Sequence, residues 1–296
     1  MTTDIANPFL KLKARTLLLW TFLLSLSMGF GLGLISAVTP LKTTDPLWAA
    51  ILYVAIFGSL SLLSWRQLRQ AGADPMNVLG KRSLSHPWWS IVGLVAALLS
   101  FSLGAFFVSF ILLSFAAPDF VQSVLQGIAQ QAKPESDFPV VFSGVNAVVL
   151  VIVAPLTEEF LFRGILLQRW ATKWNPQTAL IVSSIVFGLM HVNVIGLSLF
   201  GLAMGLLYFK TRTLLTPIVC HGLNNAAALG LGLLSTGDQK TTVTTLESLR
   251  SEWWVGLLLI LVSAPFLLRL VVKNFPRQEA QAPYFINAIA KKVSKA

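Results

Sequence analysis

Charged residues are scarce in this chain of 296 residues. They make up 11% of it, and hydrophobic residues make up 55%. Soluble domains carry charge on about a quarter of their residues. A surface with so little charge excludes an ordinary soluble domain, so the lipid bilayer is the expected solvent for most of the chain.

Cysteine is almost missing as well, because Cys220 is the single one. No intramolecular disulfide and no cysteine-based metal cluster can therefore form. Acidic residues are outnumbered, 12 against 22 Lys and Arg, which gives a net charge of +10. The basic residues are scattered between apolar segments and form no stripe with aromatic partners, so no nucleic acid is expected as a partner.

The apolar runs predict an all-α polytopic membrane protein with about eight transmembrane helices. A helix needs about 20 residues to cross the hydrocarbon core. The fifth and sixth runs are separated only by Gly196 and are expected to form a tight pair. The eight predicted spans are 16–38, 47–65, 88–116, 140–169, 178–194, 197–209, 214–234 and 253–272.

Most Lys and Arg residues outside these spans fall on the side that also holds both ends of the chain. The positive-inside rule makes that side cytoplasmic, so the protein is predicted to be a multi-pass membrane protein with both termini cytoplasmic. We divide it into N-terminal helices and loops (1–139), a core that holds the polar residues described next (140–234), and a last span with a basic tail (235–296).

Charged and histidine side chains within the spans are few, and apart from Arg169 and Arg269 near span ends they fall in three of them. Each costs at least about 2.5 kcal/mol at the bilayer centre, so such a residue suggests a functional site. The fourth span holds Glu158, Glu159 and Arg163, the fifth holds His191, and the seventh holds His221 with Asn225.

Helical spacing distinguishes the two carboxylates. Glu159 and Arg163 are four residues apart and are expected to form an ion pair, whereas Glu158 points about 100° away. Pro155 lacks a backbone N–H and is expected to loosen the helix just before them. Only one of the two glutamates is therefore predicted to be neutralised by Arg163.

Water activation is the chemistry that these side chains support. Glu158 and His191 could take a proton from a water, while His221 and Asn225 could donate hydrogen bonds to an oxyanion. A Glu and two His can also hold a catalytic zinc or another divalent metal, here Glu158, His191 and His221. The amide in the cluster favours chemistry without a metal, so no cofactor is favoured.

At these residues the chain resembles the CPBP family of CAAX proteases and bacteriocin-processing (Abi) membrane endopeptidases, which includes the Ras-converting CAAX endopeptidase. The family pattern is EExxxR, FxxxH and HxxxN or HxxxD on three helices. The matching residues are Glu158, Glu159 and Arg163, then Phe187 and His191, then His221 and Asn225. The resemblance implies an endopeptidase in which Glu158 and His191 activate water and His221 and Asn225 stabilise the oxyanion. Glu159 and Arg163 would support the site, and Phe187 belongs to the second motif.

Other intramembrane proteases are excluded by residue type. No His precedes a Glu as a zinc HExxH enzyme requires, and every Asp lies outside the spans. The resemblance implies a membrane-associated protein or peptide as substrate, in contact with membrane lipid; whether that substrate is lipidated, and the oligomeric state, are left open. The alternative is a non-catalytic membrane scaffold, immunity or transport-assisting protein that uses the polar cluster for helix packing.

Three further segments carry structural predictions. The glycines of GFGLGL (29–34) and of GLAMG (201–205) are expected to pack closely against neighbouring helices. The segment 118–139 has apolar residues at helical spacing and is expected to lie along the membrane interface.

Overall fold

The structure is a computed structural model that describes residues 7–38, 42, 44–80, 88–132, 136–235 and 245–294. Every regular element in these ranges is a helix, which confirms the all-α polytopic fold. Lys81, Arg82, Lys133, Lys240 and Lys295, which count toward the predicted orientation, lie outside the described ranges.

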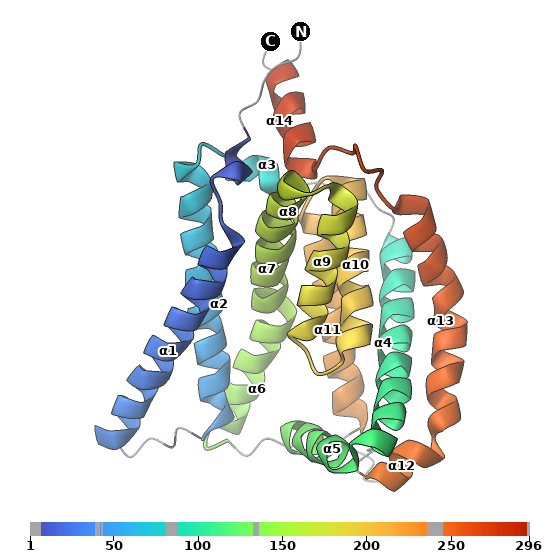
Figure 1. The fold of residues 1–296 in the computed structure, drawn as a ribbon. Helices are drawn as coiled ribbons and strands as arrows, with labels where there is room; N and C mark the ends of the chain where they lie inside the picture. Colours follow the sequence, from blue (N-terminus) through green and yellow to red (C-terminus); the bar gives the residue numbers. More distant parts are fainter. Residues whose placement is uncertain are drawn as a thin grey trace.

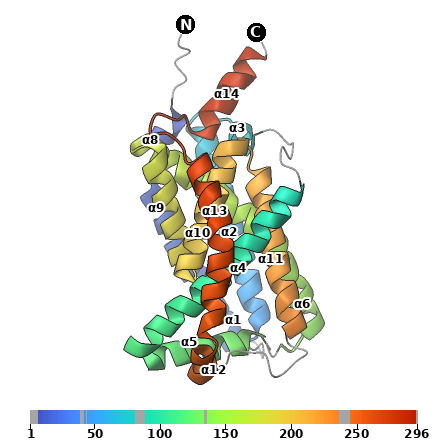
Figure 2. The same cartoon turned by 90° about the vertical axis from the view of Figure 1, so that its right-hand side faces the viewer.

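The long helices stand side by side in one bundle, drawn in Figures 1 and 2. They are α1 (Ala14–Val38), α2 (Pro46–Gln70), α4 (Trp88–Ala116), α10 (Val194–Thr211), α11 (Leu215–Ser235) and α13 (Trp253–Asn274). A further one is continuous but made of five segments, α6 (Pro139–Val148), η2 (Val149–Val153), α7 (Ala154–Glu159), η3 (Phe160–Leu167) and α8 (Gln168–Lys173). The shorter helices are η1 (Pro8–Leu10), α3 (Pro75–Leu79), α5 (Pro118–Ala132), α9 (Pro176–Leu189), α12 (Leu246–Ser251) and α14 (Pro283–Val293).

The first and last described helices meet at one end of the bundle (Figure 1). The Phe9 ring of η1 lies 5.1 Å from that of Tyr284 in α14, edge to face. At the opposite end, α5 lies across the bundle, and its Val121 and Leu125 are buried against α4 and α12. The helix predicted in 118–139 is therefore present, with one face used for packing within the protein.

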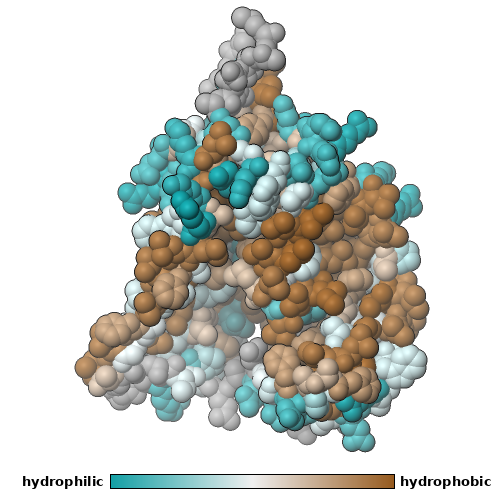
Figure 3. Space-filling view, viewed as in Figure 1, coloured by the Kyte–Doolittle hydropathy of each residue, from teal (hydrophilic) through white to brown (hydrophobic). Residues whose placement is uncertain are grey.

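Seven helices in the described residues are long and apolar enough to cross a membrane. The flanks of the bundle are accordingly covered with hydrophobic side chains between more hydrophilic ends (Figure 3). The predicted span 178–194 needs correction. Its helix α9 ends at Leu189 after 14 residues, or about 21 Å, which is too short to cross the hydrocarbon core.

The predicted tight pair is α9 with α10, and small residues let the two helices approach. A Cβ on Gly201 would lie 3.1 Å from the Cα of Ser184, which confirms the expectation for GLAMG. The expectation for GFGLGL is wrong within the described chain, because a Cβ on Gly29 or Gly31 would meet no atom within 4 Å.

The short helix α9 ends inside the bundle. The turn between α9 and α10 carries Asn193, which donates from Nδ2 to the backbone oxygen of Ser102 at 2.7 Å. Ser102 lies midway along the 29-residue helix α4, so this turn is at the middle of a span. Irregular backbone at that depth is tolerated only where protein buries it or where it lines a cavity.

Candidate active site

Glu159 is the centre of a buried ionic cluster that joins two helices. Its Oε1 accepts from Arg163 Nη1 at 3.0 Å and lies 2.9 Å from Nδ1 of His221 in α11. The side chains of Glu159 and Arg163 are 0% and 3% exposed. Arg163 also donates from Nη2 to the backbone oxygen of Gly201 at 2.9 Å, which ties in α10. The predicted ion pair is confirmed. Neither oxygen of Glu159 is open to a substrate, because Oε1 is hydrogen-bonded twice and Oε2 is fully buried without a partner.

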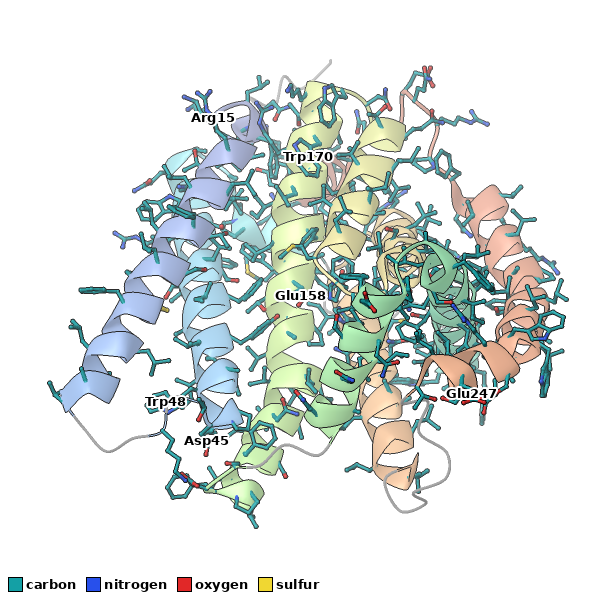
Figure 4. The ribbon with its side chains drawn as sticks, turned by 60° about the horizontal axis from the view of Figure 1, so that its bottom comes forward. Arg15, Asp45, Trp48, Glu158, Trp170 and Glu247 are labelled. Atoms are coloured by element: carbon teal, nitrogen blue, oxygen red, sulfur yellow. The ribbon has the colours of Figure 1, made fainter. Side chains whose placement is uncertain are left out.

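Glu158 faces the other way, as the helical spacing requires. Its Oε1 accepts a hydrogen bond of 2.7 Å from the hydroxyl of Tyr53 in α2. Unlike Oε2 of Glu159, Oε2 of Glu158 is not a fully enclosed atom, and it takes no hydrogen bond from the described residues. Figure 4 shows Glu158 near the middle of the bundle, between the levels of Trp170 and Asp45. One oxygen of this carboxylate is thus fixed and the other is available.

His191 lies in the mid-span turn after α9 and not within a helix, which corrects the sequence interpretation. Its Nδ1 is 2.8 Å from the backbone oxygen of Phe187. A carbonyl oxygen only accepts, so Nδ1 carries the hydrogen and Nε2 of the neutral ring carries the lone pair. The ring is only partly buried, and its lone pair is free to accept a hydrogen from water.

His221 has the same Nδ1 donor but a different acceptor. Because the Glu159 carboxylate accepts from Nδ1, the ring presents Nε2 as an acceptor when neutral and as a donor when protonated. His221 is 4% exposed, and its ring packs edge-on against that of Phe200 at 4.9 Å. Its orientation is therefore fixed by a carboxylate and an aromatic ring.

Phe187 links the members of the site. Its ring is fully buried and lies 4.8 Å from the His191 ring and 6.1 Å from the His221 ring. The guanidinium carbon of Arg163 lies 4.7 Å from the same ring centre, a cation–π distance. Phe187 therefore sets the spacing between the two histidines and shields the ionic cluster from water.

Asn225 is bound to an interrupted part of the neighbouring helix. In the π-helix η2 each backbone N–H reaches the carbonyl five residues back, as Ala154 does to Val149. The next donor in that register would be residue 155, but this residue is proline and has no N–H. The carbonyl of Leu150 therefore has no backbone donor, and it accepts from Asn225 Nδ2 at 2.9 Å instead. One amide hydrogen of Asn225 is used in this way, and the second remains for another acceptor.

The helix that carries the glutamates is thus loosened by more than Pro155. Two π-helical segments, η2 and η3, flank the short α-helix α7 on which Glu158 and Glu159 lie. Such segments are rare and occur frequently at functional sites. The sequence predicted a loosened helix from the proline alone.

The sequence leaves a metal site as an alternative, with Glu158, His191 and His221 as ligands. Within the described ranges no three His, Cys, Asp or Glu side chains are grouped so that they could hold a metal ion. Nδ1 of His221 and Oε1 of Glu158 are also already engaged in hydrogen bonds. The arrangement of these side chains does not fit a metal.

The structure brings Glu159, Arg163, His221, Phe187 and His191 into one contiguous cluster. No hydrogen bond in the described chain joins Glu158 directly to His191, so their cooperation would require an intervening molecule. Sequence reasoning missed Tyr53. The signal available was a phenol hydroxyl inside an apolar span, in a chain with three tyrosines.

The comparisons with known proteins concern this same part of the chain. Residues 141–227 match the family described as type II CAAX prenyl endopeptidase Rce1-like. Over 104 residues the chain is 30% identical to the protein named "Putative membrane peptidase YdiL" of Bacillus subtilis (strain 168). The alignment covers 33% of this chain and 43% of that relative, so the chain spans less than half the length of the curated relative it matches.

No solved structure matches the chain. The family match contains all seven motif residues, from Glu158 to Asn225, and excludes α1, α2, α4 and α13. The resemblance to the CPBP family is confirmed for residues 141–227, and the apolar helices make this an integral, multi-pass membrane protein.

Proposed function

We propose that this protein is an intramembrane endopeptidase that hydrolyses a peptide bond with a water activated by Glu158 and His191. The observation that carries the proposal is the contrast between the two adjacent carboxylates. Glu159 is bound by Arg163 and His221. Glu158 accepts a hydrogen bond from Tyr53 with one oxygen, and its other oxygen takes no hydrogen bond from the described residues. A purely structural cluster has no need of the second carboxylate.

The water would lie between the available oxygen of Glu158 and the lone pair on Nε2 of His191. Glu158 takes one proton from it while the oxygen forms a bond to the carbonyl carbon of the scissile peptide. The proton then passes to the amide nitrogen as the C–N bond breaks. A positioned general base of this kind contributes about 10²- to 10⁴-fold to the rate.

The oxyanion formed in this step needs hydrogen-bond donors. Asn225 retains one amide hydrogen, and His221 donates from Nε2 when its ring is protonated, with Glu159 stabilising that charge from the other side. Removing one such donor typically lowers kcat by about 10²- to 10³-fold. Glu159 and Arg163 act by holding His221 in place.

The substrate class follows from the location of the site. Glu158 lies within a span, so the scissile bond must belong to a membrane-associated protein or peptide that enters the bundle among membrane lipids. The basic residues favour a cytoplasmic position for both ends of the chain, and α14 would then lie in the cytoplasm.

The alternative function is a non-catalytic scaffold, immunity or transport-assisting protein. One experiment separates the two. Membrane-associated peptide termini are compared in cells that produce the wild-type chain, Glu158→Gln or His191→Ala at equal levels of inserted protein. We expect new termini only with the wild type. Identical termini in all three would refute the enzyme assignment and favour the scaffold.

Metal dependence is tested separately on the purified protein. We expect the wild type and His191→Ala to contain the same substoichiometric amount of zinc. Stoichiometric zinc in the wild type that disappears in His191→Ala would contradict the metal-free mechanism.

A further inference from the structure

We propose that Tyr53 is a positioning residue for Glu158, so that α2, which lies outside the family segment, forms part of the active site. The inference rests on the proposed function and deepens it. It starts from the 2.7 Å hydrogen bond in which the Tyr53 hydroxyl donates to Oε1 of Glu158. The two residues are 105 positions apart in the chain.

The Tyr53 ring is itself held in place. It stacks on the ring of Phe57, one helical turn further along α2, with centroids 4.4 Å apart and planes inclined by 16°. The hydroxyl also interacts with Thr157, the residue before Glu158. The donor therefore approaches Glu158 from a fixed direction, with little rotamer freedom to lose on binding.

The helix α2 is anchored to the segment that precedes the glutamates. Asp45, at the start of α2, accepts from the Ser136 hydroxyl at 3.0 Å and from the backbone N–H of Asp137 at 2.8 Å. Asp137 in turn pairs with Lys42 at 2.9 Å. Tyr53 lies eight residues beyond Asp45, about 12 Å along the axis. This clamp fixes the distance between α2 and the glutamate helix below the site.

Above Tyr53 the two helices separate. A cavity of about 390 Å³ lies between α2 and α7, lined by residues that include Ser61, Trp65, Thr157 and Phe160. Its lining is almost entirely apolar; Ser61 and Thr157 supply its hydroxyls, and neither donates to Glu158. In the described structure Tyr53 is the side chain that donates to Glu158.

Tyr53 is the side chain that holds Glu158 in the described structure. The charged groups of the neighbouring cluster are Glu159 on α7, Arg163 on η3 and His221 on α11, and both Arg163 and His221 bind Glu159. His191, in the turn after α9, makes no direct hydrogen bond to Glu158 among the described residues. This leaves Tyr53 as the specific hydrogen-bond partner of Glu158.

The test is to measure kcat and KM separately for Tyr53→Phe, on the full chain in detergent with a cleavable membrane peptide. The ring and its stacking are retained, so the fold should survive. We expect kcat at neutral pH to fall about 10- to 100-fold with little change in KM, because a misplaced base slows the chemical step and not substrate binding. In a Glu158→Gln background, Tyr53→Phe should cause no further loss.

The matched control is Tyr208→Phe. Tyr208 also donates a 2.7 Å hydrogen bond from a buried position, but to the backbone oxygen of Val78. It is expected to lower thermal stability and leave kcat unchanged. Phe57→Leu, which removes the stacking partner but not the hydroxyl, should give a smaller fall in kcat than Tyr53→Phe.

The outcomes separate the two levels of the proposal. If Glu158→Gln is inactive while Tyr53→Phe and Phe57→Leu keep the wild-type kcat, the role of Tyr53 is refuted and the proposed function stands. If Glu158→Gln keeps full activity, the proposed function itself is refuted. A fall in kcat of the same size in Tyr208→Phe would show that the effect is a general loss of packing and would overturn the inference.

Discussion

Breaking the buried ion pair of Glu159 should lower the stability of the protein, whereas mutation of Glu158 should lower its activity. The stability effect is tested most directly at Arg163. Arg163→Met removes the permanent cation and leaves Glu159, which is 0% exposed, with the Nδ1 hydrogen of His221 as its remaining partner. Its Oε2 has no hydrogen bond to compensate. Breaking a buried ion pair by removing one partner costs about 3–5 kcal/mol, because the remaining charge stays buried. We therefore expect a loss of stability in that range.

Two comparison variants make this number interpretable. Glu159→Leu combined with Arg163→Met removes both charges, and replacing a buried pair by apolar groups is often close to neutral. The double variant should therefore be more stable than Arg163→Met alone. Glu158→Gln keeps an acceptor for the Tyr53 hydroxyl and should stay within about 1 kcal/mol of the wild type while losing activity.

The measurement is equilibrium unfolding of the full chain in mixed micelles, with insertion checked before each series. If Arg163→Met is no less stable than Glu158→Gln, the ionic cluster does not stabilise the fold and the expected cost is refuted. If the double variant is less stable than Arg163→Met, the cost comes from lost packing and not from a buried charge that has lost its partner.

Three further variants, at Pro155, Gly188 and Asp45, test the interrupted helix, the close packing of α9 on α10 and the cap of α2. Pro155→Ala supplies an N–H for the carbonyl that Asn225 now binds, so activity should fall about tenfold or more with little change in thermal stability. Gly188→Ala should destabilise the protein by about 1–3 kcal/mol, because its Cβ would lie 2.5 Å from a backbone oxygen of α10. The control Gly93→Ala, with open space around its Cβ, should stay within about 1 kcal/mol in the same unfolding assay. Asp45 has a pKa below its usual 3.8, chiefly because the backbone N–H of α2 donates to it, so its contribution is present above that value and lost as the pH falls below it. Asp45→Asn should therefore flatten the loss of thermal stability between about pH 5 and pH 2, and an unchanged acid limb would contradict this assignment.

The features that sequence predicted correctly are those that follow from local geometry. A separation of four residues places Glu159 beside Arg163 on any helix, and the same geometry turns Glu158 away from both. Neither statement depends on the neighbouring helices, so the structure could only confirm them or show that no helix forms. Which neighbours fill the two faces was not contained in the spacing.

The position of His191 was predicted wrongly because the end of α9 is set by tertiary contacts. The apolar pattern continues past Leu189, so no break is visible from hydropathy. The available signal was Asn193, which caps α10 by accepting from the backbone N–H of Gly196. An N-cap residue two positions after His191 indicates that a new helix starts there.

Long-range partners are the other part that sequence could not supply. Tyr53 and Glu158 are 105 residues apart, and His221 and Glu159 are 62 apart. Nothing in the local pattern of α2 or α11 specifies which carboxylate each of them contacts. The sequence therefore identified the motif residues but assigned His221 to the oxyanion without its bond to Glu159.

The irregular backbone explains why two amides accompany the charged groups. Unpaired backbone groups at membrane depth cost several kcal/mol each, so a helix can be interrupted there only if another donor or acceptor replaces the lost bond. Asn225 binds the carbonyl exposed by the proline, and Asn193 binds Ser102 where α9 ends. Each amide thus permits one interruption, and each interruption carries one of the groups proposed to hold the water. Replacing either asparagine should therefore disturb Glu158 or His191 through the backbone, even where the amide itself never touches the substrate.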